Sequence, residues 1–78
     1  MKYERIEQNP AIMFGKPVIK GTRITVELIL RKISGGKTFD EIMVAHPHLI
    51  VEDIYAAVAF SADYLAFEDI VFADMVTA

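Results

Sequence analysis

Residues 25–41 read TVELILRKISGGKTFDE, and this stretch contains the helix signals on which the predicted fold depends. The apolar residues of its first half recur at i, i+3, i+4 and i+7, which is the spacing of one helix face. Thr25 is a typical helix N-cap, and the glycine pair at 35–36 is a typical helix end. Thr38 and Glu41 then match the capping-box pattern that opens a second helix. The stretch therefore predicts two short helices joined by a glycine turn.

The segment before this stretch predicts a short β-hairpin over about residues 18–24. Val18-Ile19 and Arg23-Ile24 are short runs that contain β-branched residues, and Lys20-Gly21 lies between them. Glycine readily adopts the positive φ that a tight hairpin turn requires. We therefore expect Val18-Ile19 and Arg23-Ile24 to pair as strands.

The segment after this stretch predicts a third helix, the longest of the three. Pro47 ends the second helix before it, because the residue that precedes a proline is disfavoured in the α region. The expected helices cover about residues 26–34, 39–45 and 51–66. Such an arrangement is the trihelical pattern of helix-turn-helix proteins. The predicted fold class is mostly α, a three-helix bundle with a short N-terminal β-hairpin.

Size and composition indicate that a second molecule completes this domain. The chain has 78 residues, no cysteine and 54% hydrophobic residues. A domain of this length buries only about 60% of the surface that its unfolded chain exposes. The third helix is apolar on most of its sides, and two short helices cannot cover all of them. We therefore expect a homodimer or a tightly bound partner to cover a face formed by Tyr55, Ala59, Phe60, Ala62 and Tyr64.

Charge is segregated along the chain. The eight basic residues all lie at or before Lys37, where three acidic residues oppose them, so this half carries +5. The remainder has eight acidic residues and no basic residue, a charge of −8. Such asymmetry predicts one surface for an anionic partner and another for a basic one; the alternative is that the halves attract each other. The candidate DNA contacts are Lys16, Lys20, Arg23, Arg31, Lys32 and Lys37.

The start of the third helix argues against its use as a DNA-recognition helix. Glu52 and Asp53 lie there, and carboxylates that face DNA phosphates repel them. Arg23 also has a second interpretation, as a structural clamp whose guanidinium pairs with Glu52 or Asp53. Arg23 is therefore open between a DNA contact and a structural role.

The sequence contains no pattern of catalysis, metal binding or membrane insertion. Ser34 and Ser61 lie in no nucleophile motif, and Pro47 separates His46 from His48 without the i, i+4 spacing of a zinc pair. The N-terminus is charged, and the most apolar stretch is far shorter than the ~20 residues that span a bilayer. We therefore expect a cytoplasmic binding protein without enzymatic activity, cofactor, metal or membrane contact.

The N-terminal motif is similar to that of a known family. Residues 9–24 read NPAIMFGKPVIKGTRI, and they are followed by Val26, Gly36, Glu41-Ile42, Pro47-His48-Leu49, Asp53-Ile54 and Ala57. These residues resemble domain-of-unknown-function family 433, DUF433, over residues 4–66. The resemblance implies a homeodomain-like helix-turn-helix fold and a prokaryotic protein. Members of this family are regarded as antitoxins of toxin–antitoxin systems whose toxin resembles the PIN ribonucleases.

The resemblance also implies a division of the chain. Such antitoxins bind operator DNA with the N-terminal domain and the toxin with the C-terminal part, as dimers. Residues 1–66 are then the family domain, and residues 67–78 are a partner-binding tail with contacts at Phe67, Ile70, Val71, Phe72 and Asp74. The sequence leaves open whether this tail is helix or strand. The alternative function is a dimeric protein-interaction module with no nucleic-acid role.

One departure from the family pattern concerns the start of the third helix. Ile50 stands where the family usually has a Ser or Thr that caps this helix. Loss of such a cap costs about 1 kcal/mol. The cost is avoided only where Glu52 and Asp53 compensate at the helix start.

Overall fold

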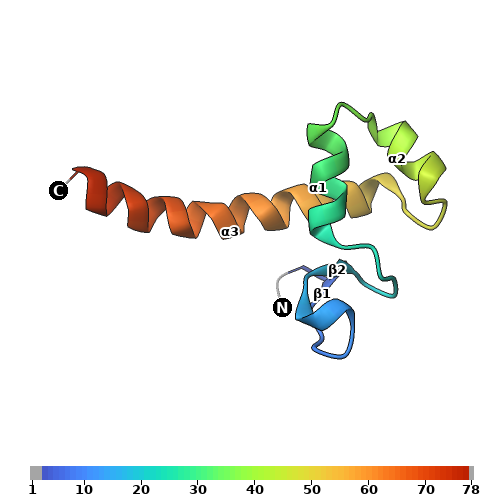
Figure 1. Ribbon diagram of the computed structural model, residues 1–78, viewed down its shortest axis with the longest axis horizontal. Coiled ribbons are helices and arrows are strands. Elements are labelled where there is room, and N and C mark those ends of the chain that lie inside the picture. Colours follow the sequence, from blue (N-terminus) through green and yellow to red (C-terminus); the bar gives the residue numbers. More distant parts are fainter. Residues whose placement is uncertain (1–2, 78) are drawn as a thin grey trace.

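Three helices and a short sheet make up this protein (Figure 1). The computed structural model describes the backbone of residues 3–77 and the side chains of residues 3–66. The predicted fold class, three helices with a short N-terminal β segment, is confirmed. The elements in chain order are β1 (Ile6–Glu7), a 3-10 turn η1 (Met13–Gly15), β2 (Val18–Ile19), α1 (Val26–Ser34), α2 (Phe39–Ala45) and α3 (Val51–Thr77).

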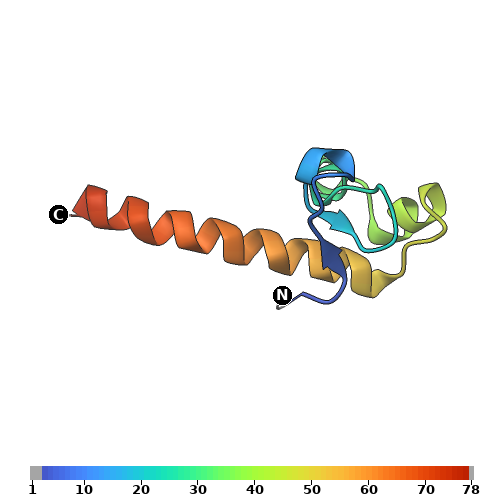
Figure 2. The same cartoon turned by 90° about the horizontal axis from the view of Figure 1, so that it is seen from below.

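The molecule has two parts, a body and an arm. Helices α1 and α2 and the sheet gather around the first turns of α3, and the rest of α3 projects away from them (Figures 1 and 2). We call residues 3–61 the body and residues 62–77 the arm. Every arm residue whose side chain is described, from 62 to 66, is exposed. One continuous helix therefore runs from a packed environment into solvent.

The first two helices begin with the capping chemistry that the sequence predicts. The Leu28 amide donates to Thr25 Oγ1 at 3.0 Å at the start of α1. At the start of α2 the capping box is complete: the Glu41 amide donates to Thr38 Oγ1 at 3.1 Å, and the Thr38 amide donates to Glu41 Oε1 at 2.9 Å. Gly36 has a φ of 92°, the left-handed conformation that follows a helix end. The prediction of two helices around a glycine turn is confirmed.

Asp53 holds the start of α3. Its Oδ2 accepts a hydrogen bond from the Ile50 amide at 3.0 Å, and its Oδ1 accepts one from Arg5 Nη1 at 3.1 Å. Asp53 is only 6% exposed, and a carboxylate buried without such partners is costly. Asp53 therefore compensates for the missing Ser or Thr at Ile50.

The strand pairing differs from the predicted hairpin. Residues Val18–Ile19 of β2 pair antiparallel with Ile6–Glu7 of β1, and Arg23-Ile24 does not form a strand. The predicted turn is present, with Gly21 at a φ of 80°, and beyond it the chain meets β2 in an isolated bridge between Thr25 and Val18, where the Ile19 amide donates to the Ile24 carbonyl at 2.9 Å. The physical reason is burial: β1 brings the apolar Ile6 to the core, whereas the charged Arg23 stays exposed.

Helix α3 is longer than predicted. Its backbone is helical to Thr77, whereas the sequence predicts a helix that ends near residue 66 and leaves open whether the tail is helix or strand. The chain contains no proline or glycine after Pro47. Nothing in the sequence therefore stops the helix once it has started.

Buried isoleucines from both strands and all three helices form the centre of the core. Each is at most 3% exposed: Ile6 of β1, Ile19 of β2, Ile29 of α1, Ile42 of α2 and Ile54 of α3. Full burial of such a side chain contributes about 1.5–3 kcal/mol. Ala57, one turn after Ile54, is also fully buried. The core thus holds only the first turns of α3.

Candidate interaction surfaces

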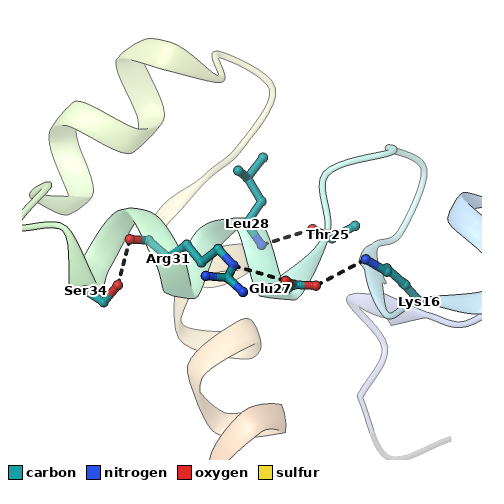
Figure 3. Close-up of polar contacts among 6 residues, drawn as sticks. All are labelled: Lys16, Thr25, Glu27, Leu28, Arg31 and Ser34. Carbon is teal, nitrogen blue, oxygen red and sulfur yellow. Dashed lines mark hydrogen bonds and ion pairs between the residues drawn. The ribbon is translucent and has the colours of Figure 1, made fainter.

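The predicted DNA contacts fall into three separate places, of which the first is the exposed face of α1. Lys16 Nζ lies 3.3 Å from Glu27 Oε1, and Arg31 Nε lies 3.0 Å from Glu27 Oε2 (Figure 3). The hydrogen bonds from Arg31 and then Lys16 hold the pKa of Glu27 below its ordinary value of 4.5. Glu27 is therefore ionised at neutral pH and offsets one of the two positive charges that Lys16 and Arg31 offer to an anion.

The second place is the junction of α1 and α2. Lys32 and Lys37 line a surface hollow of about 470 Å³ together with Asp40 and Glu41. Hydrogen bonds from Thr38 hold the pKa of Glu41 below its ordinary value of 4.5. Two carboxylates therefore offset the two lysines at this junction as well.

The third place is the turn between β2 and α1. Lys20 and Arg23 are exposed there, and within the described residues Arg23 makes no ion pair. The clamp on Asp53 that the sequence suggested as an alternative for Arg23 is made by Arg5 instead. Among the six candidates, Lys20 and Arg23 are therefore the two that have, in the part of the chain that the structure describes, neither an ion pair nor a place in the hollow beside Asp40 and Glu41.

The five residues predicted to form a dimer or partner face do not share one face of α3. Three of them form an exposed stripe at i, i+4 and i+7 spacing: Tyr55, Ala59 and Ala62. The other two, Phe60 and Tyr64, follow the buried Ala57 at i+3 and i+7. They therefore continue the core-facing side of α3: Phe60 packs against the core at the end of the body, and Tyr64, in the arm, is 62% exposed. Their rings stack with centroids 6.3 Å apart.

A mostly apolar groove lies between the body and the start of the arm. It has a volume of about 350 Å³. Its apolar lining comes from both parts of the molecule: Pro17, Val26, Leu30, Phe60, Tyr64 and Leu65. Lys16 and Glu27, which pair with each other, also line it. The sequence indicated Phe60 and Tyr64 but not the groove, because its walls come from segments far apart in the chain.

The loop between β1 and β2 presents a residue that sequence reasoning missed. Phe14 is 95% exposed and has a φ of 59° and a ψ of 30°. Met13 before it also has a positive φ, 51°. The left-handed conformation costs a residue other than glycine about 1–2 kcal/mol. No signal in the sequence marked Phe14, because a phenylalanine in an apolar run is usually buried.

Backbone hydrogen bonds fix the shape of this loop. Asn9 Oδ1 accepts from the Ala11 amide at 2.9 Å, and the Asn9 carbonyl accepts from the Ile12 amide at 2.8 Å. The Gly15 amide then donates to the Ile12 carbonyl at 3.1 Å. These bonds lie on both sides of Phe14 and hold the backbone in the conformation that exposes its ring.

The predicted tail contacts lie on α3, but their side chains are outside the described residues: Phe67, Ile70, Val71, Phe72 and Asp74. Among the described residues, no group of three His, Cys, Asp or Glu side chains could hold a metal ion. In the same part of the chain, no helix combines the length and the apolar character that a bilayer crossing demands.

Comparisons with known proteins find relatives by sequence and by structure. Residues 6–61 match the model of the family described as "Protein of unknown function (DUF433)". The crystal structure of a DUF433 member protein from Anabaena variabilis ATCC 29413 is similar, with a TM-score of 0.75, 26% identity, and coverage of 88% of this chain and 68% of that chain. No curated protein matches the chain. The family match ends at Ser61, where the body ends and the arm begins.

Proposed function

This chain belongs to the DUF433 family of proteins of unknown function, and we propose that it acts as an antitoxin-like binding module. In this proposal the protein is a cytoplasmic dimer without enzymatic activity. Its arm binds and neutralises a PIN-like toxin ribonuclease, and the basic half of its body binds operator DNA. The resemblance to antitoxins supplies the idea, and the division into body and arm supports it.

The exposed arm is the observation that carries the proposal. Tyr64 and Leu65 are 62% and 59% exposed, on the side of α3 that is buried one or two turns earlier. Short helices in proteins are stabilised mainly by packing of an apolar face, so a free arm gains stability from a partner. From Ala62 onward the arm has four acidic residues and no basic one. An acidic, apolar helix is complementary to the basic cleft in which a ribonuclease binds RNA.

The serine hydroxyls favour binding over catalysis. Ser34 Oγ donates to the Arg31 carbonyl at 2.8 Å, and Ser61 Oγ donates to the Ala57 carbonyl at 2.8 Å. A catalytic hydroxyl instead needs a base within hydrogen-bond reach. Both hydroxyls bond to the backbone of their own helix, which supports a protein without enzymatic activity.

Operator binding in this proposal relies on the turn between β2 and α1. Lys20 and Arg23 are exposed there, whereas Lys16 and Arg31 share the carboxylate of Glu27. Few phosphate contacts give weak DNA binding, because affinity and its dependence on salt both grow with the number of phosphates contacted. The proposal therefore includes operator binding that is weak for the chain alone and stronger when a dimer presents two copies of the turn.

The second candidate function is a protein-interaction module with no nucleic-acid role. It is favoured by the carboxylates that accompany most of the basic candidates: Glu27 beside Lys16 and Arg31, and Asp40 and Glu41 beside Lys32 and Lys37. In this alternative the dimer and the contact of the arm with its partner are kept, and DNA binding is absent.

A nuclease assay tests the toxin-binding half. The protein should co-purify with the product of the adjacent reading frame and should inhibit its cleavage of RNA at equimolar ratio. Phe72→Asp should abolish this inhibition, because a carboxylate cannot enter an apolar interface without a large desolvation cost. Val44→Asp is the matched control, since Val44 is 80% exposed on α2, and should inhibit normally. A neighbouring nuclease that remains fully active, or a Phe72→Asp variant that inhibits like wild type, contradicts this half.

A gel-retardation assay at low salt decides between the two candidates. Wild type should retard the DNA upstream of its own reading frame, and the double variant Lys20→Glu/Arg23→Glu should not, while it still inhibits the nuclease. No retardation by wild type, with or without the nuclease, leaves the protein-interaction module as the function.

A further inference from the structure

Two surface features lie close together where the body meets the arm. Phe14 projects from the loop between β1 and β2, and the apolar groove lies between the body and the arm. They are neighbours, because the loop turn ends at Gly15 and the next two residues, Lys16 and Pro17, line the groove. Phe14 is 95% exposed, so it does not occupy the groove of its own chain.

We propose that Phe14 of one copy inserts into the groove of a second copy and that the reverse contact forms at the same time. Such a contact is isologous, because the same surface of each copy supplies both the projection and the hollow. The inference rests on the dimer of the proposed function and names the surface that forms it. The contact covers the start of the arm at Tyr64 and Leu65, and the rest of the arm remains available to another partner.

The groove has the size and the chemistry to hold a phenyl ring. Its volume of about 350 Å³ is in the range of small-ligand pockets. Leu30, Phe60 and Leu65 offer apolar contacts, and the stacked rings of Phe60 and Tyr64 offer edges and faces to a third aromatic ring. Aromatic side chains seated in such pockets are the usual anchors of protein interfaces.

Charge favours a second copy as the occupant. An isologous contact brings identical surfaces together, so any unpaired charge near the axis meets its own like charge. The loop from Gln8 to Gly15 has no charged residue. The charges that line the groove, Lys16 and Glu27, already pair at 3.3 Å. Two copies of a chain with +5 and −8 halves can therefore meet at this surface without repulsion between like charges.

The conformation of the loop also favours a role of Phe14 in binding. Met13 and Phe14 both have positive φ, and the hydrogen bonds of Asn9 hold this strained turn although it buries nothing in the body. Strained backbone of this kind concentrates at binding sites, where it presents a side chain in advance of the partner. A fixed loop also loses little conformational freedom on association.

Sedimentation equilibrium of the full-length chain tests the proposal with Phe14→Gly. Glycine accepts the positive φ, so this variant should fold at least as well as wild type in a thermal melt. Its dimer dissociation constant should rise by at least about thirtyfold, the loss expected for one interface anchor, because the dimer of the variant lacks both Phe14 rings. The control is Val44→Ala, at a residue 80% exposed on α2, and it should leave the dimer dissociation constant unchanged.

A second measurement identifies the groove. Leu65→Ala should weaken the dimer, and the double variant Phe14→Gly/Leu65→Ala should be little weaker than Phe14→Gly alone, because both changes remove one contact. In a mixed sample of labelled and unlabelled chains, nuclear Overhauser effects should join the Phe14 ring of one copy to the methyl groups of Leu30 and Leu65 of the other.

Three outcomes overturn the inference: a chain that stays monomeric at millimolar concentration, a dimer as tight in Phe14→Gly as in wild type, or a dimer broken by Ala62→Glu but not by Phe14→Gly. The last result would move the interface to the exposed stripe of α3. Each outcome is read on the chain alone, so it is separate from nuclease inhibition, which tests the proposed function.

Discussion

The two halves of α3 have similar residues and opposite surroundings. In the first turns Ile54 and Ala57 are fully buried against α1 and β1. Two turns later Tyr64 and Leu65, on the same side of the helix, are 62% and 59% exposed. The sequence pattern does not change between them; what changes is that the body ends. An apolar stripe therefore shows which side of a helix can be buried, and the neighbouring elements determine how much of that side is buried.

The largest expected effect on stability comes from truncating a buried residue of α3, compared with an exposed residue on the same side. Ile54→Ala should lower the free energy of unfolding by about 2–5 kcal/mol, because it opens a cavity in the core. Leu65→Ala should change it by no more than about 0.5 kcal/mol in dilute solution, where that side chain is in water. Urea denaturation at low protein concentration measures both. Equal costs for the two substitutions would contradict the statement that Ile54 is buried and Leu65 is exposed.

The next effect concerns the point at which α3 joins the body. Asp53→Ala should cost about 1–3 kcal/mol, because it removes the acceptor of the Ile50 amide and the partner of Arg5. Glu52→Ala, at the exposed neighbouring residue, is the control and should cost less than about 0.5 kcal/mol. Thermal melts compare the two variants. An Asp53→Ala variant as stable as Glu52→Ala would contradict the role of Asp53 in stabilising the start of α3.

A smaller effect is expected at the cap of α2. Thr38→Ala removes the oxygen that accepts from the Glu41 amide and should cost about 1 kcal/mol. Thr38→Ser keeps that oxygen and should be nearly neutral. Chemical denaturation separates these outcomes, and a serine variant as unstable as the alanine variant would show that the methyl group, not the cap, matters.

The smallest effect on stability belongs to Glu27. Its pKa lies below 4.5, so its ion pairs stabilise the fold above the ordinary pKa and are lost as the pH falls through the lowered one. Glu27→Gln should lower stability slightly at pH 7, where the ion pairs are present, and not at pH 3, so that the acid limb of the variant is flatter in melts recorded between these values. The same variant frees Lys16 and Arg31. If the body binds DNA, its affinity should rise, and unchanged affinity would favour the protein-interaction module.

The helices of the body could be predicted because their signals are local. Thr25, Thr38 and Gly36 act on amides and carbonyls within one turn, and each does what its residue type predicts. The pairing of β1 with β2 could not be predicted, since Ile6 and Ile19 are brought together by the core rather than by the turn between them. Such long-range pairing is invisible to spacing rules.

The interaction surfaces could be predicted only in part. Phe60 and Tyr64 were found because helical spacing marks a face. The groove was missed because α1 supplies one of its walls, and Phe14 was missed because an aromatic residue carries no sign of its exposure. The role of Asp53 was half foreseen: the helix start required a carboxylate, but only the fold shows that Arg5 pairs with it.

Amide hydrogen exchange along α3, measured at protein concentrations from micromolar to millimolar, shows directly whether the arm is incomplete in a single chain. We expect high protection for residues 54–61 at every concentration, and protection for residues 62–66 that is low in dilute solution and rises as copies associate. The arm would then be shown to need a second molecule. Equal, concentration-independent protection along the whole helix would contradict the claim that the arm is incomplete in a single chain.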